Sequence, residues 1–344
     1  SLGLGVMARF YLIEWPMIRR ILPSAFAVIF VICLSSFAVA LTLGGGPKAT
    51  TIELAIYQAF RFEFDFATAA LLGLVQLFLS VSAAGVALWL AGHDRLGIGL
   101  DRPAPAALRP LSERCIDAGV ILGAMLFLIL PLALLFIKGA AGVPDLGAPV
   151  WFAALRSLAL ALGATLLCLC FALPLATRWG ELIATLGIAV SPLVLGTGLF
   201  LIVRPYVNPF DVALGVTLCV NALMSLPFAL RILRPEVQAV EQNFSHLSAA
   251  LGLGAWGWFR WVMLPRLRRP LGFAAGLTAA LSMGDLGVIA LFGDAERATL
   301  PLKLYQLMGS YRMDQAAAAA VLLLALSLGL FWLFDRVGRY GAQD

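Results

Sequence analysis

Eight long apolar runs constrain this chain more than any other feature of its sequence. They cover about residues 21–43, 67–92, 116–137, 151–176, 181–203, 211–232, 271–293 and 316–334. Each is long enough for a bilayer-crossing helix, which takes about 20 mostly apolar residues. Lipid offers no hydrogen bonds to an exposed backbone, so we expect these runs to be helical. The sequence therefore predicts an all-α polytopic membrane protein with about eight transmembrane helices.

Composition agrees with lipid as the solvent of this chain. Hydrophobic residues make up 62% and charged residues 12%, whereas a soluble domain carries about 25% charged residues. The net charge is +5, but the basic residues lie in short segments between apolar runs, which argues against nucleic acid as a partner. The five cysteines show no CxxC spacing, so we interpret them as small apolar residues and expect neither disulfides nor a metal site.

The distribution of Arg and Lys predicts the orientation. With the N-terminus placed in the cytoplasm, 16 of the 24 basic residues fall in inner segments, seven fall in outer segments, and Arg156 lies within a span. Cytoplasmic segments of membrane proteins carry the excess of Lys and Arg. We therefore expect both termini to be cytoplasmic.

An internal repeat divides the chain. Residues 1–22 match residues 250–271 at an offset of 249, and the similarity continues to Asp65 and Asp314. The matched positions are Leu2, Gly3, Phe10 and Pro16 in the first copy and Leu251, Gly252, Phe259 and Pro265 in the second. We interpret residues 1–92 as the C-terminal part of a first module, 93–115 as a cytoplasmic linker, and 116–344 as a complete second module. The natural N-terminal part is therefore expected to be missing.

The repeated segments, 1–22 and 234–270, are both predicted to be cytoplasmic loops. In the second, Ser245 or Ser248 is expected to cap a short helix, and Pro265 is expected to end a helical stretch that carries Trp256 and Phe259. One interpretation is an amphipathic segment at the lipid headgroups. The other is a short helix that binds a groove on a cytoplasmic partner. The matched spacing of the two copies favours the partner.

At these residues the chain resembles the permeases of ABC importers. Gly252, Phe259, Val262 and the pair Leu264-Pro265 follow the spacing of the family's cytoplasmic "EAA" loop, although His246 stands where the family has its Glu. The chain is more closely similar to the permeases of bacterial thiamine (thiamine pyrophosphate) importers, which are fused double permeases. The stretches that carry this likeness are Phe37–Phe60, Leu281–Gly293 and Thr299–Arg312.

The resemblance implies a type I ABC-importer permease fold, with the ABC transmembrane domain at about 151–335. It implies a multi-pass protein of the bacterial inner membrane that binds no cofactor and has no catalytic residues. ATP and Mg²⁺ would bind a separate cytoplasmic ATPase dimer, which would grip the two loops at Leu2, Gly3, Phe10, Pro16, Leu251, Gly252, Trp256, Phe259 and Pro265. A periplasmic binding protein would deliver the small-molecule substrate. In agreement, none of the three lysines precedes Ser or Thr, as a P-loop requires.

Three polar residues inside apolar runs are candidates for the substrate path. Asp285 lies about 20 Å along its predicted span, where a charged group usually faces a cavity or a partner. Thiamine is cationic, so this carboxylate could attract it; a structural hydrogen bond or ion pair is the alternative. Asn221 and Ser225 interrupt another span and could line a path or pack against neighbouring helices.

Other function classes fit the sequence less well. Iron(III) importers also have fused double permeases and stay an alternative. A secondary transporter would need several intramembrane acids, and the paired loops would have no role in it. The only histidines, His93 and His246, fall in predicted loops, so a membrane-embedded enzyme with a His-based site is disfavoured.

Overall fold

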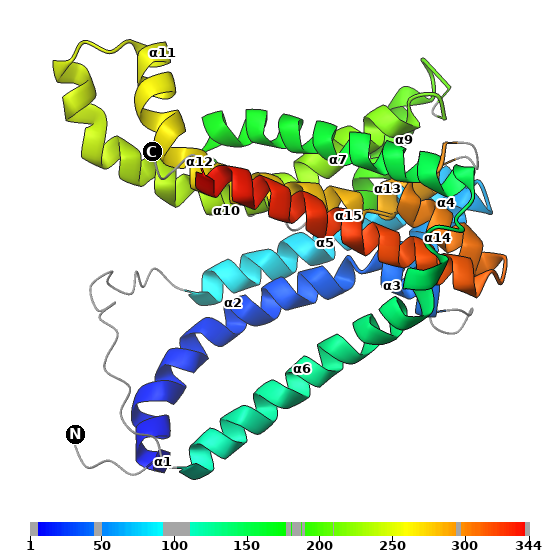
Figure 1. Ribbon diagram of the computed structural model, residues 1–344, viewed down its shortest axis with the longest axis horizontal. Helices are drawn as coiled ribbons and strands as arrows, with labels where there is room; N and C mark the ends of the chain where they lie inside the picture. The colour runs from blue at the N-terminus through cyan, green and yellow to red at the C-terminus, as the bar shows by residue number, and fades with distance from the viewer. Residues whose placement is uncertain are drawn as a thin grey trace.

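The protein is a bundle of long α-helices in the computed structural model, which describes residues 6–44, 50–91, 111–176, 180, 187, 190–208, 210–293 and 297–340 (Figure 1). These residues contain no strand. The elements are α1 (Val6–Arg9), η1 (Phe10–Glu14), α2 (Trp15–Leu34), α3 (Phe37–Leu43), α4 (Ile52–Arg61), α5 (Phe66–Ala91), α6 (Leu111–Gly139), η2 (Ala140–Gly142), α7 (Ala148–Leu175), α9 (Pro192–Val203), α10 (Ala213–Ala250), α11 (Ala255–Gly257), η3 (Trp258–Met263), α12 (Leu264–Met283), α13 (Gly287–Phe292), α14 (Leu300–Gly309) and α15 (Met313–Tyr340).

Six described segments are long and apolar enough to cross a membrane. They are Phe66–Val86, Arg114–Gly142, Ala148–Leu175, Ala213–Ser248, Ala255–Phe292 and Met313–Tyr340, and each corresponds to one of the eight predicted spans. The first predicted span contains α3 and the part of α2 from residue 21 onward. The fifth contains α9, and its residues 181–186, 188 and 189 lie outside the described part. The all-α polytopic fold that the sequence predicted is confirmed.

The elements of the two copies repeat as the sequence does. The bounds of α2 and α12 differ by 249 at both ends, and those of α4 and α14 differ by 248 at both ends. A π-helix precedes both long helices, η1 before α2 and η3 before α12. Such π segments are rare and are frequent at functional sites. The division into modules stays an interpretation, but two equivalent sets of elements are present.

Small residues allow α12 and α15 to pack closely. A Cβ on Gly272 would lie 2.6 Å from the Phe334 carbonyl oxygen and 2.7 Å from Gly338 Cα. A Cβ on Gly276 would lie 2.9 Å from the Phe331 carbonyl oxygen. Close backbone approach of this kind drives association between helices in lipid, where apolar side chains alone give no preference.

The two ends of the molecule differ in how tightly the elements pack. In Figure 1, α3, α4, α13 and α14 gather at one end, while α1 and α11 lie apart at the other. At the gathered end, the Phe200 ring lies 4.6 Å from Phe60 and 5.4 Å from Phe292, between ring centroids. Arg61 also joins the copies there, because its Nη2 donates to the Gly293 carbonyl oxygen at 3.4 Å.

Candidate functional site

Each copy contains a segment that we call an elbow: residues 6–16 form the first elbow and residues 241–264 the second. In the second, α10 runs on to Ala250, the chain turns, and α11 and η3 lead back into α12. The prediction of a loop from residue 234 was wrong over 234–250, because α10 continues through that stretch with Pro235 inside it. Ser245 and Ser248 consequently lie within α10 and do not cap a separate helix.

Pro265 does not end a helix, contrary to the prediction. It lies in the first turn of α12, directly after η3, and Pro16 holds the same place in α2, directly after η1. A proline is tolerated in a first helical turn, where its missing N–H is not needed. The matched prolines therefore mark the point where each elbow joins its long helix.

Apolar side chains are exposed at the tip of the second elbow. Leu251, Trp256 and Trp261 have exposed fractions of 65%, 70% and 71%. Phe259 is partly buried, and its ring centroid lies 5.9 Å from that of Trp256. Such an exposed group of large apolar side chains is typical of a surface that contacts a partner or lipid headgroups.

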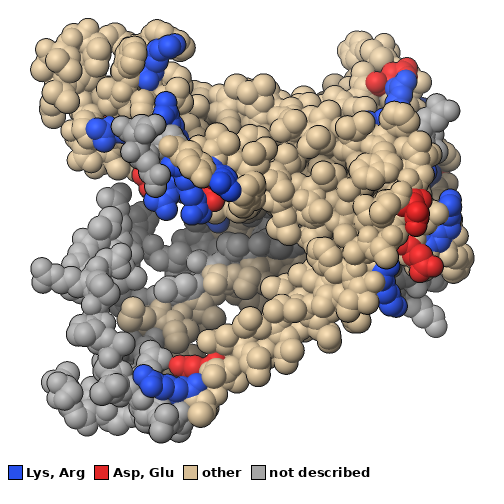
Figure 2. Space-filling model, in the orientation of Figure 1, with Lys and Arg blue, Asp and Glu red and all other residues tan. Residues whose placement is uncertain are grey.

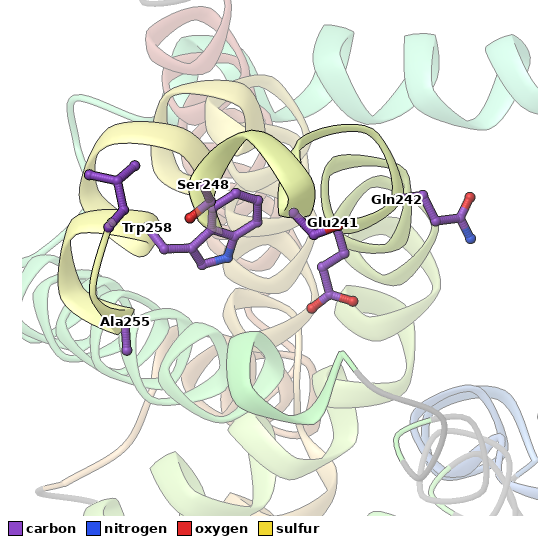
Figure 3. A pocket seen from close by; sticks show the side chains of 7 residues that line it. Glu241, Gln242, Ser248, Ala255 and Trp258 are labelled. Carbon is purple, nitrogen blue, oxygen red and sulfur yellow. The ribbon is translucent and has the colours of Figure 1, made fainter. Parts of the chain in front are cut away.

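The two arms of the second elbow line an open pocket and are joined by a side-chain contact. The pocket has a volume of about 660 Å³ and is lined by Glu241, Gln242, Ser245, Ser248, Leu253, Ala255 and Trp258. In Figure 3 the Trp258 indole reaches across it toward Ser248. The guanidinium of Arg266 lies 3.7 Å from the ring centroid of Phe244, a cation–π contact between α12 and α10. The elbow is thus a shaped unit.

The first elbow shares the exposed apolar character of the second. Tyr11 and Leu12 are more than half exposed, at 62% and 67%, and the Phe10 ring packs against Tyr11 and Trp15. The predicted docking residues Leu2 and Gly3 lie outside the described residues. Phe10 belongs to η1 and Phe259 to η3, so the structure places these two matched aromatic residues in equivalent elements.

A cavity of about 130 Å³ lies between the copies. It is lined by Ser35, Phe37, Ala38, Glu53, Pro192, Leu193, Gly284, Asp285, Leu286 and Gly287. Its walls include the break between α2 and α3 and the break between α12 and α13. At the repeat offset of 249, Ser35, Phe37 and Ala38 correspond to Gly284, Leu286 and Gly287. Equivalent helix breaks from the two copies therefore face one cavity.

Asp285 lies at this cavity, as expected if its carboxylate lines a substrate path. Its Oδ1 accepts a hydrogen bond from the Gly287 N–H at 3.2 Å. With the Asn221 amide assigned in the orientation that satisfies both its atoms, Nδ2 donates to Asp285 Oδ2 at 3.0 Å and Oδ1 accepts from Ser282 Oγ at 3.0 Å. Ser225 is buried one turn further along α10, and neither it nor Asn221 lines the cavity.

Sequence reasoning missed Glu53, the second acid of the cavity. Glu53 is only 1% exposed, and its Oε1 accepts hydrogen bonds from Gln76 Nε2, at 2.9 Å, and from Ser191 Oγ. Burial raises the pKa of the Glu53 carboxyl, the two hydrogen bonds lower it, and the nearby charge of Asp285 raises it. Gln76, a polar residue inside an apolar run, was the signal that could have pointed to this partner.

These features define an α-helical multi-pass membrane protein with paired elbows at one end and a polar cavity between its copies. No family model matches the chain. The thiamine transport system permease protein ThiP of Brucella abortus is 39% identical over 352 residues, which cover 98% of this chain and 65% of that protein. The protein of the same name from Salmonella typhimurium is 36% identical over 362 residues, covering 100% of this chain and 68% of that protein. The one from Haemophilus influenzae is 35% identical over 353 residues, covering 95% and 64%.

The chain belongs to the family of thiamine transport system permease proteins. It spans about two thirds of the length of the curated relatives it matches.

Proposed function

We propose that this chain is part of the transmembrane subunit of an ATP-driven importer that carries thiamine or thiamine pyrophosphate across the bacterial inner membrane. The family relationship supports the substrate class, because the relatives are named as thiamine transport permeases. No comparison favours the iron(III) importer or the secondary transporter. The observation that carries the mechanism is the pair of elbows, which repeat in structure and lie at one end of the molecule (Figure 1).

The elbows are the docking sites of a separate ATPase dimer in this proposal. Each ATPase subunit binds one elbow, at Leu2, Gly3, Phe10 and Pro16 or at Leu251, Gly252, Trp256, Phe259 and Pro265. Exposed apolar tips and the π segments beneath them suit a short helix that is seated in a partner's groove. ATP and its Mg²⁺ stay on the partner, and this chain supplies the path.

The direction of transport follows from the orientation. Arginines gather around the second elbow and the adjoining ends of α12 and α15 (Figure 2), which supports a cytoplasmic location for this end and for both termini. The end where α4 and α14 pack together then faces the periplasm and receives substrate from a binding protein. Closure of the ATPase dimer pushes the elbows together, and the two copies rock as rigid bodies between inward-open and outward-open states.

Copurification tests the docking role of the elbows. The full-length permease is coexpressed with its cognate ATPase subunit, as wild type and as Gly252→Asp and Phe259→Asp, with Gly329→Ala on the exposed face of α15 as the control. We expect the ATPase to copurify with the wild type and the control and to be lost from the two elbow variants, because a buried, unpaired carboxylate disrupts an interface. A wild-type permease that binds no ATPase would reject the proposal.

Uptake tests the substrate. Cells that lack their own thiamine importer receive the full-length gene with its partner subunits and are supplied with labelled thiamine or with iron(III). We expect ATP-dependent accumulation of thiamine and no accumulation of iron. Iron uptake without thiamine uptake would overturn the assignment of substrate.

A further inference from the structure

Two carboxyl groups from different copies line one small cavity. Glu53 comes from α4 of the first copy, and Asp285 comes from the break between α12 and α13 in the second. Among the described residues, no basic side chain lines this cavity. Because like charges that share a confined space repel each other, ionisation of both carboxyls is costly here, and either a proton or a positive group that joins them offsets this cost.

Two oxygens at the cavity lack hydrogen-bond partners. Oε1 of Glu53 is satisfied by Gln76 and Ser191, but Oε2 of the same carboxyl is buried and has no partner among the described residues. The Ser35 hydroxyl is buried and unpartnered in the same way. Buried polar atoms without partners are rare and costly in native proteins, and each one calls for a ligand, a water or an ion.

The size and walls of the cavity select the kind of cation. A volume of about 130 Å³ is close to the 150 Å³ of an engineered cavity that admits benzene. It holds one aromatic ring and is too small for a molecule of two linked rings. Phe37, Leu193 and Leu286 supply apolar walls, and aromatic rings attract organic cations. Among the described residues, no group of three or more His, Cys, Asp or Glu side chains is placed to hold a metal ion.

We infer that Glu53 and Asp285 form a subsite for the charged ring of an organic cation, held between the two copies. The inference rests on the proposed function, in which the cargo supplies a thiazolium ring. The rest of the cargo lies outside this cavity. Because the two acids belong to different copies, rocking of the copies separates them and weakens their joint hold on the cation. The subsite therefore binds in one state and releases in the other.

Charge-selective labelling tests the subsite without any transport. Ala38 lines the cavity and is exposed, so Ala38→Cys is introduced into the full-length permease–ATPase complex on a cysteine-free background. The rate at which the introduced thiol reacts with a methanethiosulfonate that carries a trimethylammonium group is measured. This rate is divided by the rate at which the same thiol reacts with the neutral hydroxyethyl methanethiosulfonate. Ser310→Cys, on the exposed turn after α14, is the reference.

We expect this ratio to be higher at Ala38→Cys than at Ser310→Cys and to fall about fivefold or more when Glu53→Gln is added, because a negative charge at short range concentrates the cationic reagent. The nearly isosteric Glu53→Gln and the neutral reagent together correct for changes in folding or access. Glu63→Gln, an exposed acid in the α4–α5 turn, should leave the ratio unchanged. A ratio that is insensitive to Glu53→Gln would overturn the inference.

Uptake separates this inference from the proposed function. We expect Glu53→Gln and Asp285→Asn each to lower the initial rate of thiamine uptake at least about tenfold, as loss of one member of a charge-recognition site does. Both variants should still copurify with the ATPase. Normal uptake by Glu53→Gln would refute the subsite and leave the importer standing. A wild type that carries no thiamine but shows the charge-selective labelling would refute the substrate assignment and leave the cation site standing.

Discussion

Gly252 adopts the left-handed backbone region, with φ of +63°, in the turn that joins α10 to α11. L-residues other than Gly pay about 1–2 kcal/mol for this conformation. Gly254, two residues on, has φ of −67°, which any residue can adopt, and open space around it. The two glycines of the matched Leu-Gly-Leu-Gly sequence thus have different physical roles, and only the first is required by backbone geometry.

Gly252→Ala is expected to loosen the second elbow, while Gly254→Ala is not. A strain of about 1 kcal/mol raises the population of a locally opened elbow about fivefold, and cleavage by a protease tracks that population when opening is fast. Limited trypsin digestion at the exposed Arg260 of the full-length protein measures it. Equal cleavage of the two variants would show that the turn geometry does not hold the elbow.

Asp285 and Glu53 show what single residues in a sequence can reveal about a site. Asp285 stood out because a lone acid inside a long apolar run is conspicuous, and the structure places it at a cavity. Glu53 did not stand out, because the polar segment around it reads as an outer loop. Its burial depends on Gln76 and Ser191, which are 23 and 138 residues away, and no local pattern encodes that contact.

At the scale of elements, the long apolar runs located the long helices but not their continuation beyond the apolar region. The polar residues 234–250 resembled a loop, yet α10 extends through them because α12 packs alongside and Arg266 stacks on Phe244. Pro265 resembled a helix end, yet it occupies a first turn that follows a π segment. Packing against a neighbouring helix overrides local propensity in the first case, and the tolerance of a first helical turn for proline explains the second.

The contact between α12 and α15 gives a prediction about stability. Gly272→Ala places a Cβ within 2.6 Å of the Phe334 carbonyl oxygen, and overpacking of this kind costs about 1–3 kcal/mol. Gly329→Ala on the same helix pair meets nothing within 4 Å. We expect the midpoint of thermal unfolding in detergent to fall for Gly272→Ala and to stay within error or rise slightly for Gly329→Ala. A similar midpoint for both would contradict close packing at Gly272.

At the scale of the whole molecule, the two copies meet at one end and diverge at the other (Figure 1). The Phe60, Phe200 and Phe292 rings and the hydrogen bond from Arg61 to Gly293 close the far end. The elbows extend from the diverging end, so a force applied to them acts on both copies through continuous helices. The distribution of Arg and Lys in the sequence predicted that the two elbows lie on the same side. The closed far end depends on contacts between residues that are distant in the sequence, and the sequence does not show these contacts.

Labelling from each side of the membrane tests the paired elbows most directly. Tyr11→Cys and Leu251→Cys, both at exposed positions of the two elbows, are placed in the full-length protein on a cysteine-free background, with Ser310→Cys at the opposite end. Intact cells and inverted vesicles are treated with a membrane-impermeant thiol reagent. The account predicts that both elbow cysteines react only in inverted vesicles and that Ser310→Cys reacts only in intact cells. Reaction of the two elbow cysteines from opposite faces of the membrane would contradict it.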